Sequence, residues 1–305
     1  MNRRSFSRHL AGAVAGTGAL STAFAGMPRS DFAPYKVSVM LWTVFTKMPF
    51  EQRLEKIVEA GYSNVELIGE YQKWSEQEWK QAIQKSKQLG ITFDITAGLA
   101  HGVANPHDRD VLLADVRHEL NSMERLGCPA LIIMSGNVVP GMPRAVQHAS
   151  CIEGLKRAVT LVEGKQINGQ PVRLLLENID PEENPKYYLT SVAEGFEIVR
   201  AVNHPQVRLL YDFFHEQISE GNLIEKLEKN IDYTGLVHIA DVPGRHIPGT
   251  GEINFDNIYR KLAELKYDRI VAMEFLPLHD GVAELRRAKE QALRAGSAVA
   301  SSREN

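Results

Sequence analysis

Short apolar runs recur along the chain at fairly even spacing, and segments with helical periodicity lie between them. Eight of these runs are predicted strands: residues 35–43, 64–69, 91–98, 129–136, 172–180, 207–215, 234–242 and 269–277. Almost continuously apolar strands are typical of a parallel sheet that is covered on both faces. Eight β-α units predict a closed (β/α)8 TIM barrel of the α/β class. An open doubly wound sheet is the alternative fold, but no GxGxxG motif follows the first strand.

The helical segments carry their own end signals. Ser75 and Glu78 stand at capping-box spacing at the start of the segment 75–90. Gly61 is expected to end the helix before it. Four apolar residues share one face of that helix: Phe50, Leu54, Ile57 and Val58.

The first 25 residues have the pattern of an export signal. Arg3 and Arg4 precede an apolar stretch rich in alanine and glycine, and Ala23-Phe24-Ala25 is a small-x-small cleavage pattern. The stretch is too short and too rich in glycine for a stable membrane span. Residues 1–25 therefore resemble a twin-arginine signal peptide and predict a periplasmic protein with no membrane attachment after cleavage. A disordered cytoplasmic tail is the alternative.

The rest of the chain shows no break in composition that would separate two domains. We expect a short linker at 26–34, one barrel over 35–295 and a disordered tail at 296–305. Cys128 and Cys151 are the only cysteines. A disulfide between them stays open for an exported chain.

Charge excludes some classes of partner. The chain has 305 residues, of which 44% are hydrophobic and 24% charged, an ordinary globular composition. Its net charge of -3 provides no broad positive field for nucleic acid or an anionic membrane. A small-molecule substrate is therefore favoured. A homo-oligomer is compatible with the sequence.

Each of the last four predicted strands carries an acidic residue or a histidine near its carboxyl end, where barrel enzymes gather their chemistry. These residues are Glu177, Asp212, His238 and Glu274. A carboxylate in an apolar strand is costly to bury without a partner, so we expect a shared divalent cation. Mn²⁺, Mg²⁺, Co²⁺ and Zn²⁺ all suit three carboxylates and one imidazole. The alternative is that each residue forms a separate salt bridge or caps a helix.

Several segments together resemble the xylose isomerase-like barrels, and within them the hydroxypyruvate isomerase and ketose epimerase branch. They include SVMLWTVFTKMPFEQRLEKIVEAGYSNVEL, MSGNVVPG, ENID, YDFFH, PGRHIPGTGEINF and MEF. The resemblance implies that the four residues above bind one metal ion. It also implies that Glu177 and Glu274 exchange the substrate proton, while His215 and Arg245 hold substrate oxygens.

The implied activity is isomerisation or epimerisation of a sugar or hydroxy-keto acid. A proton leaves a carbon beside a carbonyl and returns elsewhere through an enediolate, while a metal polarises the carbonyl. No organic cofactor is required. Hydroxypyruvate isomerases usually carry His-x-Gln on the seventh strand, where this chain has Leu236 and His238. The epimerase branch carries histidine at the ligand position, so the resemblance does not fix the substrate.

Further residues are candidates around this site. Trp42, Glu66 and His101 follow or end early strands and are expected to line the substrate pocket. Asn178 is expected to orient its neighbour Glu177.

The loop after the seventh predicted strand holds two more acidic residues. Asp241 is expected to shape the turn before Pro243, and Glu252 to fix the loop by accepting from backbone amides.

Three other functions are alternatives to the isomerase. A lyase or epimerase acting on oxidised glycosides would use the same metal and carboxylates. A noncatalytic exported sugar-binding barrel would not need both Glu177 and Glu274 as proton carriers. An endonuclease is opposed by the net charge of -3.

Overall fold

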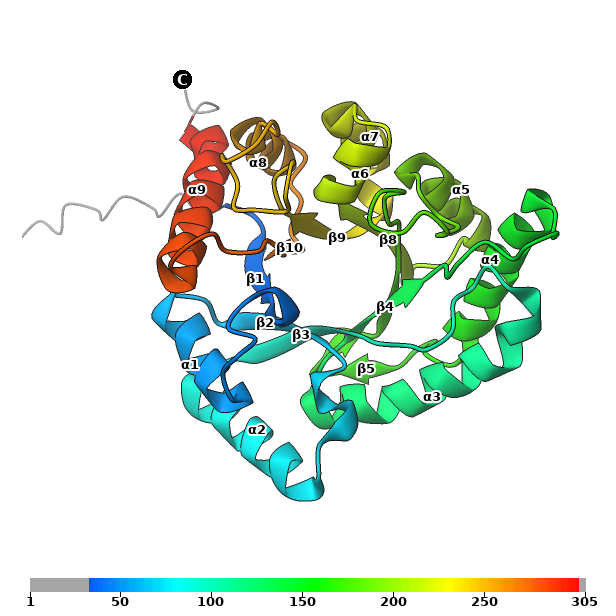
Figure 1. Ribbon diagram of the computed structural model, residues 1–305, viewed down its shortest axis with the longest axis horizontal. Helices are drawn as coiled ribbons and strands as arrows, with labels where there is room; N and C mark the ends of the chain where they lie inside the picture. Colours follow the sequence, from blue (N-terminus) through cyan, green and yellow to red (C-terminus); the bar gives the residue numbers. More distant parts are fainter. Residues whose placement is uncertain (1–32, 302–305) are drawn as a thin grey trace, which may run out of the picture. The chain divides into compact units, whose positions relative to one another are not determined.

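The structure is a computed structural model that describes residues 33–301. The predicted signal peptide at 1–25 and residues 26–32 of the predicted linker lie outside these residues. Eight parallel strands close into a barrel in the order β1-β10-β9-β8-β7-β4-β3-β2, so the predicted TIM barrel is confirmed (Figure 1). The barrel strands are β1 (Lys36–Met40), β2 (Asn64–Ile68), β3 (Thr92–Ala97), β4 (Ala130–Met134), β7 (Arg173–Glu177), β8 (Val207–Asp212), β9 (Thr234–Ile239) and β10 (Ile270–Met273).

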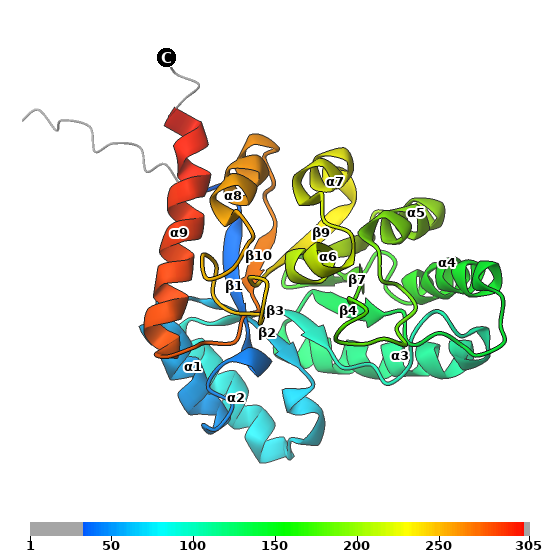
Figure 2. The ribbon, with the colours of Figure 1, turned by 45° about the horizontal axis from the view of Figure 1, so that its top comes forward.

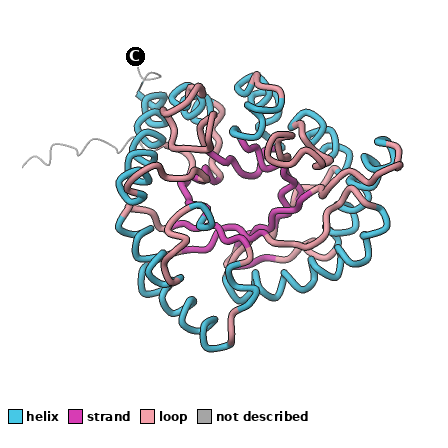
Figure 3. Tube along the Cα trace, viewed as in Figure 1, coloured by secondary structure: helices cyan, strands magenta, loops and turns pink. Residues whose placement is uncertain are grey.

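Helices surround the ring of strands, as the tube in Figure 3 and the tilted ribbon in Figure 2 show. The α-helices are α1 (Phe50–Glu59), α2 (Glu76–Leu89), α3 (Arg109–Leu126), α4 (Arg144–Thr160), α5 (Val192–Val202), α6 (Phe213–Ser219), α7 (Leu223–Asn230), α8 (Phe255–Glu264) and α9 (Gly281–Ser301). Short 3-10 helices are η1 (Leu41–Thr43), η2 (Glu70–Lys73), η3 (Pro106–Asp108) and η4 (Ile231–Tyr233). Within residues 33–301, no helix is long and apolar enough to cross a membrane.

Strand alternation creates an apolar floor inside the barrel. Four buried residues from β7, β8, β9 and β10 belong to one inner cluster: Leu175, Leu210, Leu236 and Ala272. Because side chains two positions apart share a face of a strand, the next inward positions are 177, 212, 238 and 274. These are the four predicted ligand positions, and Asp212 lies directly opposite His238 in the β8–β9 register. The strands therefore place a layer of polar side chains next to a layer of apolar side chains inside the barrel.

Most predicted helix ends are confirmed. Ser75 and Glu78 form a complete capping box at α2, and Gly61, at φ +89°, follows the end of α1. The predicted apolar face of α1 is wrong at Val58, which is 37% exposed. Arg53 is buried instead and donates to the carbonyl of Leu41, so the inner face of α1 is turned away from Val58.

Most strands are shorter than the predicted apolar runs, and two of the boundary differences have a clear structural basis. The strand expected over 207–215 ends at Asp212, because the Asp212 side chain accepts from backbone amides and caps α6. The tail expected from residue 296 is helical as far as Ser301, where α9 ends. Residues 302–305 lie outside the described chain.

The structure also contains a small β-hairpin that was not predicted from the sequence. Strands β5 (Gln166–Ile167) and β6 (Gln170–Pro171) pair antiparallel before β7. Asn168 and Gly169 both have positive φ, the conformation that Asn-Gly turns favour. The disulfide left open by the sequence is not formed, since Cys128 and Cys151 are both free and buried.

Candidate active site

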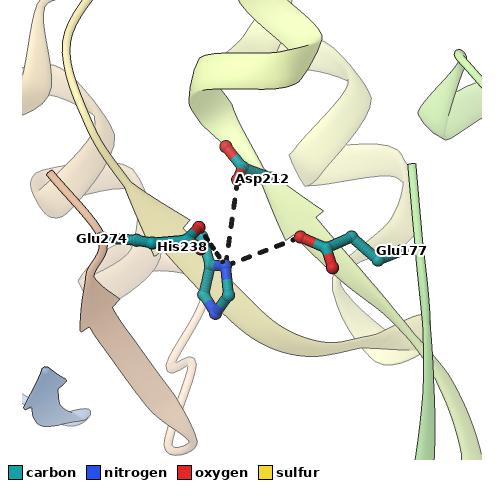
Figure 4. A group of neighbouring side chains, drawn as sticks. All are labelled: Glu177, Asp212, His238 and Glu274. Carbon is teal, nitrogen blue, oxygen red and sulfur yellow. Dashed lines mark ion pairs between the residues drawn. The ribbon is translucent and has the colours of Figure 1, made fainter. Parts of the chain in front are cut away.

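Four buried side chains converge at the carboxyl end of the barrel (Figure 4). Glu177 ends β7, Asp212 ends β8, His238 lies in β9, and Glu274 follows β10 directly. One ligand atom from each lies within 4.8 Å of the others. The fold thus brings together the four residues that the resemblance implies as metal ligands.

The two carboxylate oxygens of Asp212 have different surroundings. Its Oδ1 accepts from the backbone amides of Phe214 at 2.7 Å and His215 at 3.2 Å, which caps α6. Its Oδ2 is buried and has no hydrogen-bond partner. The cap fixes the side-chain direction, so Oδ2 faces the other three residues.

His238 lies at the centre of the group. Its Nδ1 is 2.7 Å from Glu274 Oε2, 3.7 Å from Glu177 Oε1 and 3.8 Å from Asp212 Oδ2. Although Nδ1 and Glu274 Oε2 are close, neither atom has a partner with hydrogen-bond geometry. Buried polar atoms without partners are rare in proteins and cost free energy. Three carboxylates and one imidazole nitrogen aimed at a common point fit a divalent cation.

Glu66 supports His238 from behind. It lies on β2, is fully buried, and places Oε2 2.9 Å from His238 Nε2. When Nε2 donates to this carboxylate, Nδ1 is left with a lone pair toward Asp212 and Glu274. Glu66 was expected to line the substrate pocket. It lies instead beneath the four converging residues and contacts them through the imidazole of His238.

Arg245 comes from the loop after β9. Its Nη1 is 2.7 Å from Glu183 Oε2, and its Nη2 is 2.8 Å from Glu274 Oε2. The guanidinium also lies 5.3 Å from the ring centre of Trp42 and 5.0 Å from that of Phe214. These contacts hold the planar, positively charged guanidinium group of Arg245 beside the four converging residues.

His215 approaches the group from α6. Its Nδ1 is 2.6 Å from Asp180 Oδ2, and its Nε2 is 3.6 Å from Asp212 Oδ2. Burial alone would lower the pKa of His215, but Asp212 and Asp180 outweigh it and raise this pKa. Asp180 and Glu183 were missed in the sequence. Their only signal was the acidic ENIDPEEN segment after the apolar run of β7.

Asp241 organises the loop that carries Arg245. Its carboxylate accepts from four backbone amides: those of Val242, Gly249, Gly251 and Ile253. Glu252 was expected to do this, but its carboxylate is exposed and accepts from Gln217 at 3.0 Å. The shorter side chain at the strand end is the one that reaches the amides.

Three other predicted residues have varied positions. Trp42 is 36% exposed and donates from Nε1 to Glu274 Oε1 at 2.9 Å, so it orients that carboxylate. His101 places Nδ1 2.7 Å from Asp115 on α3 and is not among the converging residues. Asn178 is buried, but neither of its side-chain polar atoms has a hydrogen-bond partner. The expected bond from Asn178 to Glu177 is therefore not formed.

The two candidate proton carriers have opposite electrostatic surroundings. Burial raises the pKa of Glu177 to about 8; His238 opposes this rise, while Glu274 and Asp212 add to it. Burial would also raise the pKa of Glu274, but Arg245 and His238 hold it well below its usual range. Without a bound cation, Glu177 therefore keeps a proton at neutral pH and Glu274 is ionised. Such separation of two neighbouring carboxyl groups is typical of acid-base pairs.

Comparison with known proteins supplies relatives for this chain. The family model described as "Xylose isomerase-like TIM barrel" matches residues 54–294. The chain is 31% identical over 255 residues to the 2-oxo-tetronate isomerase of Haemophilus influenzae, with 82% of this chain and 96% of that protein covered. It is 27% identical over 247 residues to the hydroxypyruvate isomerase of Escherichia coli, with 79% and 93% covered.

Solved structures give the same fold. A protein described as "AP endonuclease, family 2" from Brucella melitensis superposes with a TM-score of 0.74 at 25% identity, covering 82% of this chain and 96% of that one. An L-ribulose 3-epimerase superposes with a TM-score of 0.71 at 15% identity, covering 88% and 97%, which shows the fold alone. The match over residues 54–294 shows that the chain belongs to the xylose isomerase-like TIM barrel family.

Proposed function

We propose that this chain is a metal-dependent isomerase that moves a carbonyl group between neighbouring carbons of a small hydroxy-keto acid. The observation that carries the proposal is the convergence of four buried side chains, three of which (Asp212, His238 and Glu274) turn a polar atom without a hydrogen-bond partner toward the others. Relatives named 2-oxo-tetronate isomerase and hydroxypyruvate isomerase support the substrate class. Two neighbouring carboxyl groups whose pKa values are shifted in opposite directions support proton transfer at carbon.

The residues fit one divalent cation of the Mn²⁺, Mg²⁺, Co²⁺ or Zn²⁺ class. Glu177, Asp212, His238 through Nδ1, and Glu274 would hold it. When bound, the cation would polarise the substrate carbonyl and stabilise negative charge on oxygen. No organic cofactor enters this reaction.

The protein side chains move the protons. Glu274, kept ionised by Arg245, takes the proton from the carbon that bears the hydroxyl group. Glu177 takes the hydroxyl proton and delivers it to the neighbouring carbon, and Glu274 gives its proton to the former carbonyl oxygen, so the product has the same atoms as the substrate. Both carboxyl groups thereby return to their starting ionised state.

Arg245 suits the carboxylate of such a substrate, because a guanidinium binds carboxylates through two parallel hydrogen bonds. One of its present partners, Glu183, has a side chain that is 42% exposed. A substrate carboxylate would replace Glu183 on the guanidinium, while Glu274 keeps its contact with Nη2. His215, fixed by Asp180, offers Nε2 to a substrate oxygen.

Metal content tests the ligand set. The purified chain should hold about one divalent ion, since the four side chains form a single site. Asp212→Asn should lose most of this ion while retaining the α6 cap, because asparagine is as good an N-cap as aspartate. Inductively coupled plasma mass spectrometry gives the content, and Glu252→Gln serves as the control for losing an acidic residue at the rim. An Asp212→Asn variant with full metal content would contradict the assignment.

Metal affinity should fall as the pH is lowered. Burial raises the pKa of Glu177 to about 8, and Glu274 and Glu66 raise the pKa of His238 well above its usual range although burial opposes them. The cation needs both groups without their protons, so protons compete with it increasingly below pH 8. We expect a loss of about tenfold in affinity per pH unit for each displaced proton. Chelator competition between about pH 6 and pH 8 measures this, and a flat profile would refute it.

Glu66 should control the metal through His238. Glu66→Gln should weaken metal binding by about 10- to 100-fold, since it removes the carboxylate that orients the imidazole. Asp94→Asn is the matched control: Asp94 is also buried inside the barrel but accepts from Ser38 and Asn64 rather than from His238. Equal metal affinities in the two variants, measured by chelator competition, would show that Glu66 does not support metal binding.

Isotope exchange tests the reaction itself. In deuterium oxide, deuterium should enter the carbon beside the carbonyl of hydroxypyruvate or 2-oxo-tetronate, as monitored by proton NMR. Glu274→Gln should slow this exchange by about 10²- to 10⁴-fold, the usual loss on removing a general base. Glu252→Gln should exchange normally, and the metal content of both variants separates loss of the base from loss of the ion. Unchanged exchange in metal-loaded Glu274→Gln would exclude Glu274 as the base.

A further inference from the structure

The amino-terminal end of the barrel holds a second cavity, at the mouth opposite to the candidate active site. Its volume is about 610 Å³. Residues at the starts of several barrel strands line it, together with Asn168 and Gln170 of the β5–β6 hairpin. None of the four converging residues lines this cavity.

Two arginines, Arg173 and Arg269, line this cavity, and a third, Arg208, lies next to it. Arg173 begins β7, Arg208 is the second residue of β8, and Arg269 directly precedes β10. Burial lowers the pKa of Arg173, and the positive charge of Arg269 lowers it further. Burial likewise lowers the pKa of Arg208, and Arg269 and Arg173 add to the effect. The three guanidinium groups are therefore close enough to repel one another.

The arginines keep much of their donor capacity free. Arg208 donates from Nη1 to the carbonyls of His204 and Val207, and Arg269 donates from Nη1 to those of Ile231 and Thr234. The side chain of Arg173 donates no hydrogen bond to any residue of the described chain. Backbone carbonyls thus hold the guanidinium groups of Arg208 and Arg269, whereas all the N–H donors of the Arg173 guanidinium remain free.

The nearby acidic groups leave this charge largely uncompensated. Asp94 lines the cavity, but it accepts from Ser38 and Asn64, and burial raises its pKa to about 7. Asp268 is exposed. Among residues 33–301, no carboxylate oxygen lies within 4.0 Å of a nitrogen of Arg173, Arg208 or Arg269. Lys36, which also lines the cavity, adds another positive charge.

Gly235 keeps the space between these side chains open. A Cβ atom at this position would lie 2.5 Å from Leu175 Cδ2 and 2.6 Å from the Cβ of Arg208. Any larger residue would therefore push Arg208 or the apolar floor out of place. The glycine preserves both the cavity and the placement of the arginine.

We infer that this cavity binds a phosphate group, either inorganic phosphate or the phosphate of a small monoester. Half-buried like charges without a close counter-charge are unfavourable, and an oxyanion of about two charges would compensate them. Guanidinium groups bind phosphate oxygens through paired, charge-assisted hydrogen bonds. The bound anion joins the starts of β7, β8 and β10, three of the strands that carry the active-site residues at their other ends. It stabilises the barrel without taking part in the isomerisation.

Thermal unfolding of the full chain tests this site. With EDTA present and ionic strength held constant by sodium chloride, inorganic phosphate should raise Tm saturably by about 2–4 °C at concentrations well above its dissociation constant. Glycerol 3-phosphate is the second probe, and tighter binding of it would identify a monoester as the ligand. Arg173→Gln should abolish the rise, and this variant should fold well because it removes one of three repelling charges.

Two controls separate this cavity from other anion sites. Arg157→Gln removes a surface arginine that pairs with Glu153 and should keep the full phosphate effect. Arg245→Gln should keep it too, since Arg245 belongs to the opposite mouth. Calorimetric titration of Lys36→Gln, expected to bind phosphate several-fold more weakly, gives a second measurement at the cavity. No phosphate-specific rise in the parent chain, or an equal rise in Arg173→Gln, would overturn the inference.

Discussion

The structure depends on how three carboxylates are accommodated inside an apolar barrel. Glu177, Asp212 and Glu274 are buried within a few ångströms of one another, where their mutual repulsion and loss of hydration are expensive. Arg245 and His238 compensate Glu274, and burial raises the pKa of Glu177 so that it keeps its proton. Atoms without partners still remain, and one divalent cation would satisfy them together. The same constraint yields an ionised and a protonated carboxyl group side by side.

The surrounding fold holds this group in place from several directions. Strand alternation sets it directly above the inner apolar cluster, and the register of β8 and β9 aligns Asp212 with His238. Glu66 orients the imidazole from below, while Asp180 does the same for His215. Asp241 shapes the loop that brings in Arg245 through four backbone amides. His215 and the loop of Arg245 are thus held by buried carboxylates, while the indole of Trp42 orients Glu274.

The sequence predicted well what depends on local periodicity. Apolar runs with a polar residue at the carboxyl end located the barrel strands and the four converging residues, because strand alternation and parallel pairing leave few alternatives. Side-chain partners across the fold were not predictable. Glu66 and His238 are 172 positions apart, and nothing local indicates which of them faces the other. Asp180 and Glu183 were hidden in an acidic loop, where most carboxylates are solvated.

Local rules also failed where tertiary contacts outweigh them. Val58 fits the helical period of α1, yet the burial of Arg53 turns it outward. Glu252 stands in the right loop, but Asp241 at the end of β9 is closer to the amides.

Anomalous scattering from a crystal of the protein grown with Mn²⁺ would locate the cation. We expect one strong anomalous peak at the carboxyl end of the barrel, in contact with Glu177, Asp212, Glu274 and Nδ1 of His238. A peak at the neighbouring group of Asp180, Glu183 and His215, or no peak in the barrel, would contradict it.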